Sequence, residues 1–171
     1  GNPVRAAIRR GDAARGRALL GLSEDMRAED TGPEDMVAEE LPVIFFLGGS
    51  QGARQINELV AEVLPRLEAS AFVVHQTGEE AARIPDGPRY RSFAYIREEM
   101  PDLLAAADLV VGRAGAGTLW ECSALGKAMI LVPLSGSGTR GDQVENAELF
   151  AKAGAGISLV GTSSTPVNLA G

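Results

Sequence analysis

The chain has 171 residues, of which 45% are hydrophobic and 23% charged, so it is long enough for one domain with a sizeable core. Its single cysteine, Cys122, excludes an internal disulfide and favours a reducing compartment, and no apolar run reaches the roughly 18–20 residues of a membrane span. The net charge of −7 arises in one segment, because eight of the 23 acidic residues but one of the 16 basic residues lie between Ser23 and Glu40. The rest of the chain is near neutral, which argues against a nucleic-acid-binding surface.

The first forty residues predict little regular structure. Asp12 is a good N-cap for a short helix over Ala13–Leu20. The acidic stretch Ser23–Glu40 has little apolar surface, which predicts a long loop that is mobile or poorly packed. Because the chain starts at Gly1 without an initiator Met, we expect it to be a fragment of a longer protein.

A regular pattern begins at Leu41. The continuous apolar run Val43–Leu47 is typical of a strand buried on both faces, and a glycine-rich turn, Gly48–Gly52, follows it. Pro65 predicts that the next helix is kinked or ends early. The apolar residues of that helix recur at spacings of three and four along one face: Ile56, Leu59, Val60, Val63, Leu64 and Leu67.

The elements on either side of the central unit are shorter. His75 ends a strand and has no partner at metal-ligand spacing, which favours a structural histidine over a catalytic one. The elements predicted here are strands over Ala71–His75, Arg91–Ile96 and Gly156–Val160, and helices over Pro101–Ala107 and Asp142–Ala153.

The segment Asp108–Pro133 predicts a strand, a small-residue turn, a helix that opens at Thr118 and ends at Gly126, and a second strand. This order is typical of a parallel crossover unit. Free amides at the start of its helix could bind an anion, and the small residues would let a phosphate approach them closely. Glu121, about one turn into the helix, would be within reach of a sugar diol. The alternative is an ordinary crossover with a tight turn.

Strands that alternate with helices predict an α/β fold with a doubly wound parallel sheet. Such sheets bind ligands at the carboxyl ends of their strands, and the loops near Ser50, Ile96, Ala116 and Ser135 all follow strands. Neither glycine-rich turn fits the dinucleotide fingerprint or carries a Walker A lysine. The sequence therefore predicts a cleft for a nucleotide diphosphate, whose polar side chains are Ser50, Glu121, Gln143 and Asn146.

Five motifs occur in the order and approximate spacing of one family: GNPVR at 1–5, GGSQGAR-x-x-N at 48–57, HQTG at 75–78, RAGAGT-x-x-E at 113–121 and DQ-x-x-NA at 142–147. They resemble the C-terminal half of the MurG-type glycosyltransferases of peptidoglycan synthesis, from Gly1 to about Gly156. The resemblance implies a Rossmann-like half of a GT-B enzyme, an inverting hexosyltransferase. That family moves N-acetylglucosamine from UDP-N-acetylglucosamine to lipid I, which makes lipid II, and works as a peripheral protein on the cytoplasmic face of the cell membrane.

Eleven positions match the family's donor-binding residues: Arg5, Ser50, Ile96, Ala116, Gly117, Thr118, Leu119, Trp120, Glu121, Gln143 and Asn146. By resemblance, Arg5 and Ser50 contact the nucleotide and pyrophosphate, and the backbone near Ile96 pairs with uracil. The helix that follows Ala116 offers its N-terminus to the diphosphate, Glu121 holds the ribose hydroxyls, and the two side-chain amides bind the sugar. The resemblance implies no metal and no cofactor.

The resemblance also implies a division of the chain. Residues 1–40 form an interdomain segment with the acidic loop, 41–161 the UDP-sugar donor-binding domain and 162–171 a tail. The acceptor site and the catalytic base belong to an N-terminal domain outside this sequence, so we expect weak donor binding without turnover. Asp142 replaces a histidine common in the family, and the loop 135–141 is unusually rich in glycine, which leaves the sugar contacts open. Two alternatives remain: a stand-alone UDP-sugar-binding subunit that recruits a membrane partner, and a UDP-N-acetylglucosamine epimerase-like domain.

Overall fold

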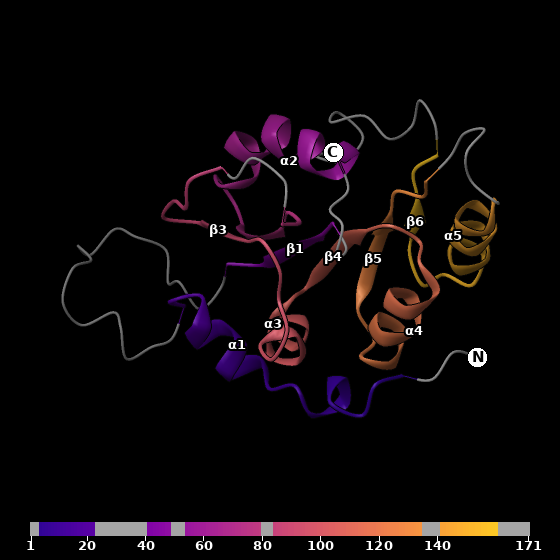
Figure 1. Ribbon diagram of the computed structural model, residues 1–171, viewed down its shortest axis with the longest axis horizontal. Coiled ribbons are helices and arrows are strands. Elements are labelled where there is room, and N and C mark those ends of the chain that lie inside the picture. Colours follow the sequence, from indigo (N-terminus) through magenta and orange to yellow (C-terminus); the bar gives the residue numbers. More distant parts are fainter. Residues whose placement is uncertain (1–3, 23–40, 49–53, 80–83, 135–140, 161–171) are drawn as a thin grey trace.

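Six parallel strands form one sheet, in the order β3-β2-β1-β4-β5-β6 (Figure 1). The computed structural model describes residues 4–22, 41–48, 54–79, 84–134 and 141–160. The strands are β1 (Val43–Leu47), β2 (Phe72–Gln76), β3 (Tyr90–Phe93), β4 (Leu109–Gly112), β5 (Ala128–Leu131) and β6 (Ile157–Ser158).

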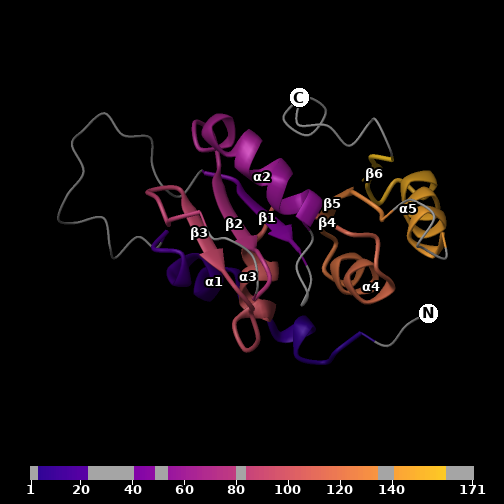
Figure 2. The same cartoon turned by 45° about the horizontal axis from the view of Figure 1, so that its top comes forward.

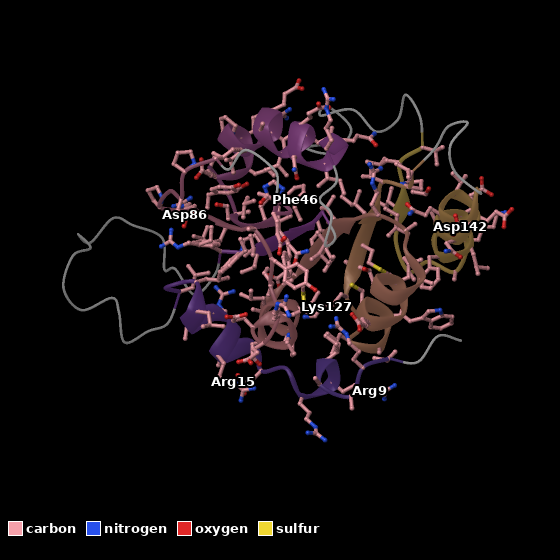
Figure 3. All side chains as sticks on the ribbon, in the orientation of Figure 1. Arg9, Arg15, Phe46, Asp86, Lys127 and Asp142 are labelled. Carbon is pink, nitrogen blue, oxygen red and sulfur yellow. The ribbon has the colours of Figure 1, made fainter. Side chains whose placement is uncertain are left out.

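Helices cover both faces of this sheet, as a doubly wound fold requires (Figures 1 and 2). They are the 3-10 helix η1 (Ile8–Arg10), α1 (Ala13–Leu19), α2 (Arg54–Leu67), α3 (Met100–Ala106), α4 (Ala116–Ala124) and α5 (Asp142–Lys152). Side chains of β1 alternate between the two faces: Phe45 packs in the cluster with α3 and α4, and Phe46 in the cluster with α2 (Figure 3). Both phenylalanines are fully buried, which explains the continuous apolar run. The predicted α/β doubly wound parallel sheet is confirmed.

Several predicted element ends are wrong by one to three residues. Pro65 was predicted to kink or to shorten its helix, and the early end is wrong, because α2 continues through Pro65 to Leu67. Proline removes one hydrogen bond near the helix end, and Leu64 and Leu67 hold the last turn against the core. Strand β3 ends at Phe93, so Ile96 lies in a loop. Phe93 pairs with the last residue of β2, and the two chains stay hydrogen-bonded as far as Gly78 N and Ala94 O (3.0 Å), where Gly78 has a φ of +93°.

The central crossover unit is confirmed as β4, α4 and β5. Helix α4 begins at Ala116, two residues before the predicted start, because Gly115 already takes the N-cap position. At its other end Gly126 adopts a left-handed φ of +64°, and Lys127 N donates to Cys122 O over 3.0 Å. The Lys127 ammonium then donates to the carbonyls of Ala105 (2.7 Å) and Ala107 (2.8 Å) at the end of α3 (Figure 3). This bond pair places a cation at the negative end of a helix and ties α4 to its neighbour.

The segment before the acidic stretch packs against α3. Ile8 and Leu20 are buried in the same core cluster as the sheet. Asp102 accepts from Arg15 Nε (3.0 Å) and Nη2 (2.9 Å), a bidentate ion pair between α1 and α3 (Figure 3). At Gly16, a Cβ would lie 2.1 Å from the Asp102 carbonyl oxygen, so a glycine is needed for the two helices to approach this closely.

Several predictions fall on residues outside the described ranges. The mobility of 23–40, the turn that carries Ser50, most of the glycine-rich loop 135–141 and the tail 162–171 all stay predictions, as does the division into domains. In the described ranges, no helix is long and apolar enough to cross a membrane.

Candidate functional site

The strand order places a topological switch point between β1 and β4. These strands are neighbours in the sheet, with Leu47 opposite Gly112. After β1 the chain crosses to β2 on one side, and after β4 it crosses to β5 on the other. The loops that follow the two strands therefore diverge and leave a crevice outside their carboxyl ends, which is where doubly wound sheets bind ligands. Helix α4 starts at this crevice.

Two glycines at the start of α4 have no structural reason to be glycine. Gly115 has an ordinary φ of −73°, and Gly117 lies inside the helix. Within the described part of the chain, no atom outside their own helix backbone and chain neighbours lies within 4 Å of the Cβ that either would carry. Among the described residues, the positions of the two missing side chains at the start of α4 are therefore open space. A phosphate group would fill such a space.

This space leads to a prediction for Gly117→Ala. We expect the free energy of unfolding to stay equal or rise by up to about 1 kcal/mol, because alanine favours the helix and meets no obstacle. If the start of α4 holds the phosphates of UDP, as the family resemblance implies, affinity for UDP should fall about tenfold, because the methyl group keeps the phosphate from the amides. Denaturant unfolding and calorimetric titration measure the two effects separately. An alanine variant that is more stable and binds UDP as well as the wild type would refute the assignment of this space to a ligand.

Glu121 lies on α4 beyond this turn and is paired with an arginine from the other end of the chain. Arg5 Nε donates to Glu121 Oε1 over 2.5 Å and Arg5 Nη2 donates to Oε2 over 2.9 Å. This hydrogen bonding is the main reason that the pKa of Arg5 is raised above its ordinary value. The carboxylate side chain is only 12% exposed, whereas that of Arg5 is 62% exposed. Two residues to which the family resemblance gives separate roles are thus in direct contact.

Helix α5 presents both predicted side-chain amides to the same edge of the sheet. Gln143 Oε1 accepts from Leu134 N over 2.9 Å, and Asn146 Nδ2 donates to Ala114 O over 3.2 Å. These bonds fix α5 to the loops that follow β5 and β4. The other polar atoms of the two amides are a donor, Gln143 Nε2, and an acceptor, Asn146 Oδ1. Groups of these two kinds can bind hydroxyl groups.

At three of the predicted positions the side chain packs against other parts of the protein. Leu119 and Ile96 are 1% and 4% exposed and belong to the core, so they can offer only backbone groups to a ligand. Trp120 packs edge-to-face on Phe150 of α5, with 5.7 Å between ring centroids. Ala116, Gly117 and Thr118 form the first turn of α4, and Ser50 is outside the described residues.

Arg113 is a site candidate that the sequence reasoning missed. It directly follows β4 at the switch point and donates from Nη1 to Gln55 Oε1 (2.8 Å) and Val132 O (3.0 Å). Burial lowers the pKa of Arg113 from its ordinary value. An arginine immediately after an apolar strand was the signal, since a cation there must lie at the carboxyl edge of the sheet.

His75 is held in a buried polar network on the α2 face of the sheet. It is 1% exposed, and its Nδ1 and Nε2 lie 3.0 Å from Tyr90 Oη and from Asn57 Oδ1. Asn57 Nδ2 donates to Thr77 O, so Asn57 Oδ1 must accept, which assigns the proton to His75 Nε2. Burial lowers the pKa of His75 to about 4. The interpretation as a structural histidine agrees with this geometry.

Cys122 is fully buried on the inner side of α4, and burial raises its pKa to about 12. A thiol in this state is a core residue and not a nucleophile, as the sequence indicated. Among the residues that the structure describes, no three His, Cys, Asp or Glu side chains are grouped to hold a metal ion.

Residues 43–171 match the model of the glycosyltransferase family 28 C-terminal domain. Two relatives are named UDP-N-acetylglucosamine--N-acetylmuramyl-(pentapeptide) pyrophosphoryl-undecaprenol N-acetylglucosamine transferase. The one from Treponema denticola is 39% identical over 97% of this chain and 42% of its own length. The one from Clostridium perfringens is 40% identical over 90% of this chain and 40% of its own length. The chain thus spans about two fifths of the curated relatives that it matches.

Solved structures of glycosyltransferases also resemble this chain. The crystal structure of Acinetobacter baumannii MurG has a TM-score of 0.66 and 30% identity, and the match covers 77% of this chain and 40% of that one. The calicheamicin glycosyltransferase CalG4 has a TM-score of 0.63 at 18% identity, over 83% of this chain and 35% of its own, which shows a shared fold. Together with the parallel sheet, these matches confirm the predicted fold class, a Rossmann-like C-terminal half of a GT-B glycosyltransferase.

Proposed function

Because the chain belongs to the glycosyltransferase family 28 C-terminal domains and matches their MurG-type members, we propose that it binds the donor UDP-N-acetylglucosamine. The complete protein would transfer N-acetylglucosamine to lipid I on the cytoplasmic face of the cell membrane. One observation carries the proposal. At the switch point of the sheet, and among the described residues, the start of α4 has two glycines with open space at their Cβ positions and a carboxylate further along the same helix.

Each group has a role in this proposal. The amides of the first turn of α4 hold the diphosphate and stabilise the charge that develops as UDP leaves. Glu121 accepts hydrogen bonds from the ribose hydroxyls, and Gln143 and Asn146 bind the sugar hydroxyls. The acceptor and the catalytic base come from the rest of the longer protein, so this chain alone binds the donor without turnover. The transfer inverts the configuration of the sugar.

Glu121→Gln tests the proposal. Charge-assisted hydrogen bonds are worth roughly 1.5–3 kcal/mol each, so we expect the variant to bind UDP about tenfold more weakly or worse. Removing one hydroxyl from the ligand should have a similar effect, so 2′-deoxy-UDP should bind the wild type more weakly than UDP. The two changes together should cost less than their sum, because each removes the same contact. Calorimetric titration of the four combinations measures this coupling.

Glu148→Gln is the matched control. Glu148 is also a helical glutamate in an ion pair, with Lys152 at 3.9 Å, but it lies on the exposed side of α5. The Glu148→Gln substitution should leave the affinities for UDP and 2′-deoxy-UDP unchanged. Strictly additive losses of binding free energy, or a Glu121→Gln variant that melts earlier yet binds UDP normally, would show that Glu121 is not part of the site.

A further inference from the structure

The ion pair between Arg5 and Glu121 occupies the two oxygens that a diol would need. A vicinal diol and a guanidinium both bind a carboxylate in a bidentate way, with one donor to each oxygen. In the structure, Nε and Nη2 of Arg5 take these places. A ribose that binds Glu121 in the same bidentate geometry competes with Arg5 for these two oxygens. Such a ribose would therefore displace Arg5 from the carboxylate.

Burial indicates which partner moves. The side chain of Glu121 is 12% exposed and belongs to a regular helix, so it stays in place and must always have donors. The side chain of Arg5 is 62% exposed and belongs to the segment before η1, which has no helix or strand of its own at this position. Water can solvate its released charge at little cost. Arg5 is therefore the partner that leaves.

We propose that Arg5 is a specificity-determining residue that exchanges ion-pair partners when a ligand binds; this rests on the proposed function. In the empty site Arg5 holds Glu121. When a nucleotide enters, the ribose diol takes Glu121, and the guanidinium turns to the phosphates held at the start of α4. Glu121 is five residues after Ala116, about 7.5 Å along the helix, a distance comparable to the length of an arginine side chain. A ligand with a diol but no anion must break the ion pair between Arg5 and Glu121, and it gives Arg5 no anion to pair with instead. The site should therefore favour ligands that carry both a diol and an anion.

Arg5→Gln gives opposite effects for two ligands. Uridine has the diol without phosphates, and we expect it to bind the variant at least about threefold more tightly, because it no longer displaces Arg5. UDP should bind about tenfold more weakly, because its phosphates lose a cation. Chemical-shift titration by NMR suits both the weak and the stronger ligand. The signal of Arg5 Nε–H should shift with UDP in the wild type.

Arg15→Gln is a closely matched control. The pair of Arg15 with Asp102 is also bidentate, and its side chains are 62% and 17% exposed. Its loss should leave both affinities unchanged. Arg5→Lys keeps the charge without the bidentate contact, so uridine should again bind more tightly while UDP binds nearly as in the wild type.

Three results would overturn the proposal. If Arg5→Gln and Arg5→Lys weaken both ligands equally, Arg5 positions Glu121 and does not leave it. If neither ligand responds to these variants, the ion pair is remote from the binding site, although UDP binding and the proposed function still stand. If the wild type binds neither ligand, the proposed function itself fails, and the exchange fails with it.

Discussion

Gly16→Ala is expected to lower the free energy of unfolding by about 3 kcal/mol, at the upper end of overpacking effects. In an isolated helix the same change would be favourable by about 1 kcal/mol, so tertiary contacts reverse the sign. The new methyl group would lie 2.1 Å from the Asp102 carbonyl oxygen and 2.7 Å from the Ala106 Cβ. Backbone and a short side chain cannot yield, so α1 must move away from α3. Denaturant unfolding measures the loss.

Gly117→Ala is the matched control, because it also adds a methyl group to a helical glycine but in open space. A Gly16→Ala variant as stable as the wild type would show that α1 does not pack on α3 in solution. The result also bears on the ligand site. Arg5 is held near Glu121 by the segment that η1 and α1 anchor, so a displaced α1 should weaken UDP binding as well.

The second large effect is a dependence of stability on pH. The pKa of His75 is lowered from 6.5 to about 4, so between these pH values the unfolded chain binds a proton that the folded chain does not. The contribution is fully present above pH 6.5 and is lost as the pH falls towards 4. We expect the free energy of unfolding to fall by about 3 kcal/mol across this range. Protonation would force Nδ1 to donate to Tyr90 Oη, which now donates to it.

His75→Gln separates this effect from that of the carboxylates. The variant should be less stable at neutral pH, because the network with Asn57 and Tyr90 is disrupted, but its stability should change much less between pH 6.5 and 4. The pKa of Asp102 is lowered mainly by its hydrogen bond with Arg15, so its contribution falls as the pH falls through the ordinary carboxylate range, equally in the variant and the wild type. Equal pH slopes in variant and wild type, from denaturant unfolding at several pH values, would show that His75 does not titrate in this way.

Much of the fold could be predicted because its signals are local. The apolar run Val43–Leu47 indicated a strand buried on both faces, and Asp12 marked the start of α1. Element ends were less certain because they depend on partners elsewhere in the sheet. Strand β3 stops where its neighbour stops, at a register that the segment near Arg91 does not encode by itself.

The sequence predicted candidate site residues, which stay a prediction, but it did not predict the contacts between them. Because the carboxyl ends of parallel strands meet at one edge of the sheet, the sequence predicted that Glu121, Gln143 and Asn146 lie near that edge. Nothing local indicates that Glu121 pairs with Arg5, because 116 positions separate them. The network of His75 with Asn57 was missed for the same reason. Leu119 shows that a motif does not predict where a side chain points. It belongs to the motif of the predicted site, but its side chain lies on the face of α4 that packs into the core.

The burial of Cys122 provides a built-in reporter of motion. Cys122 is the only cysteine in the chain. It lies on the buried face of α4, next to Glu121 in sequence. A thiol reagent can reach it only when α4 lifts from the sheet or the whole chain unfolds. The rate of labelling in the native state therefore measures how often this helix opens, without any introduced probe. A ligand bound at the N-terminus of α4 would slow that reaction, so one cysteine can report occupancy of a site at the start of its own helix.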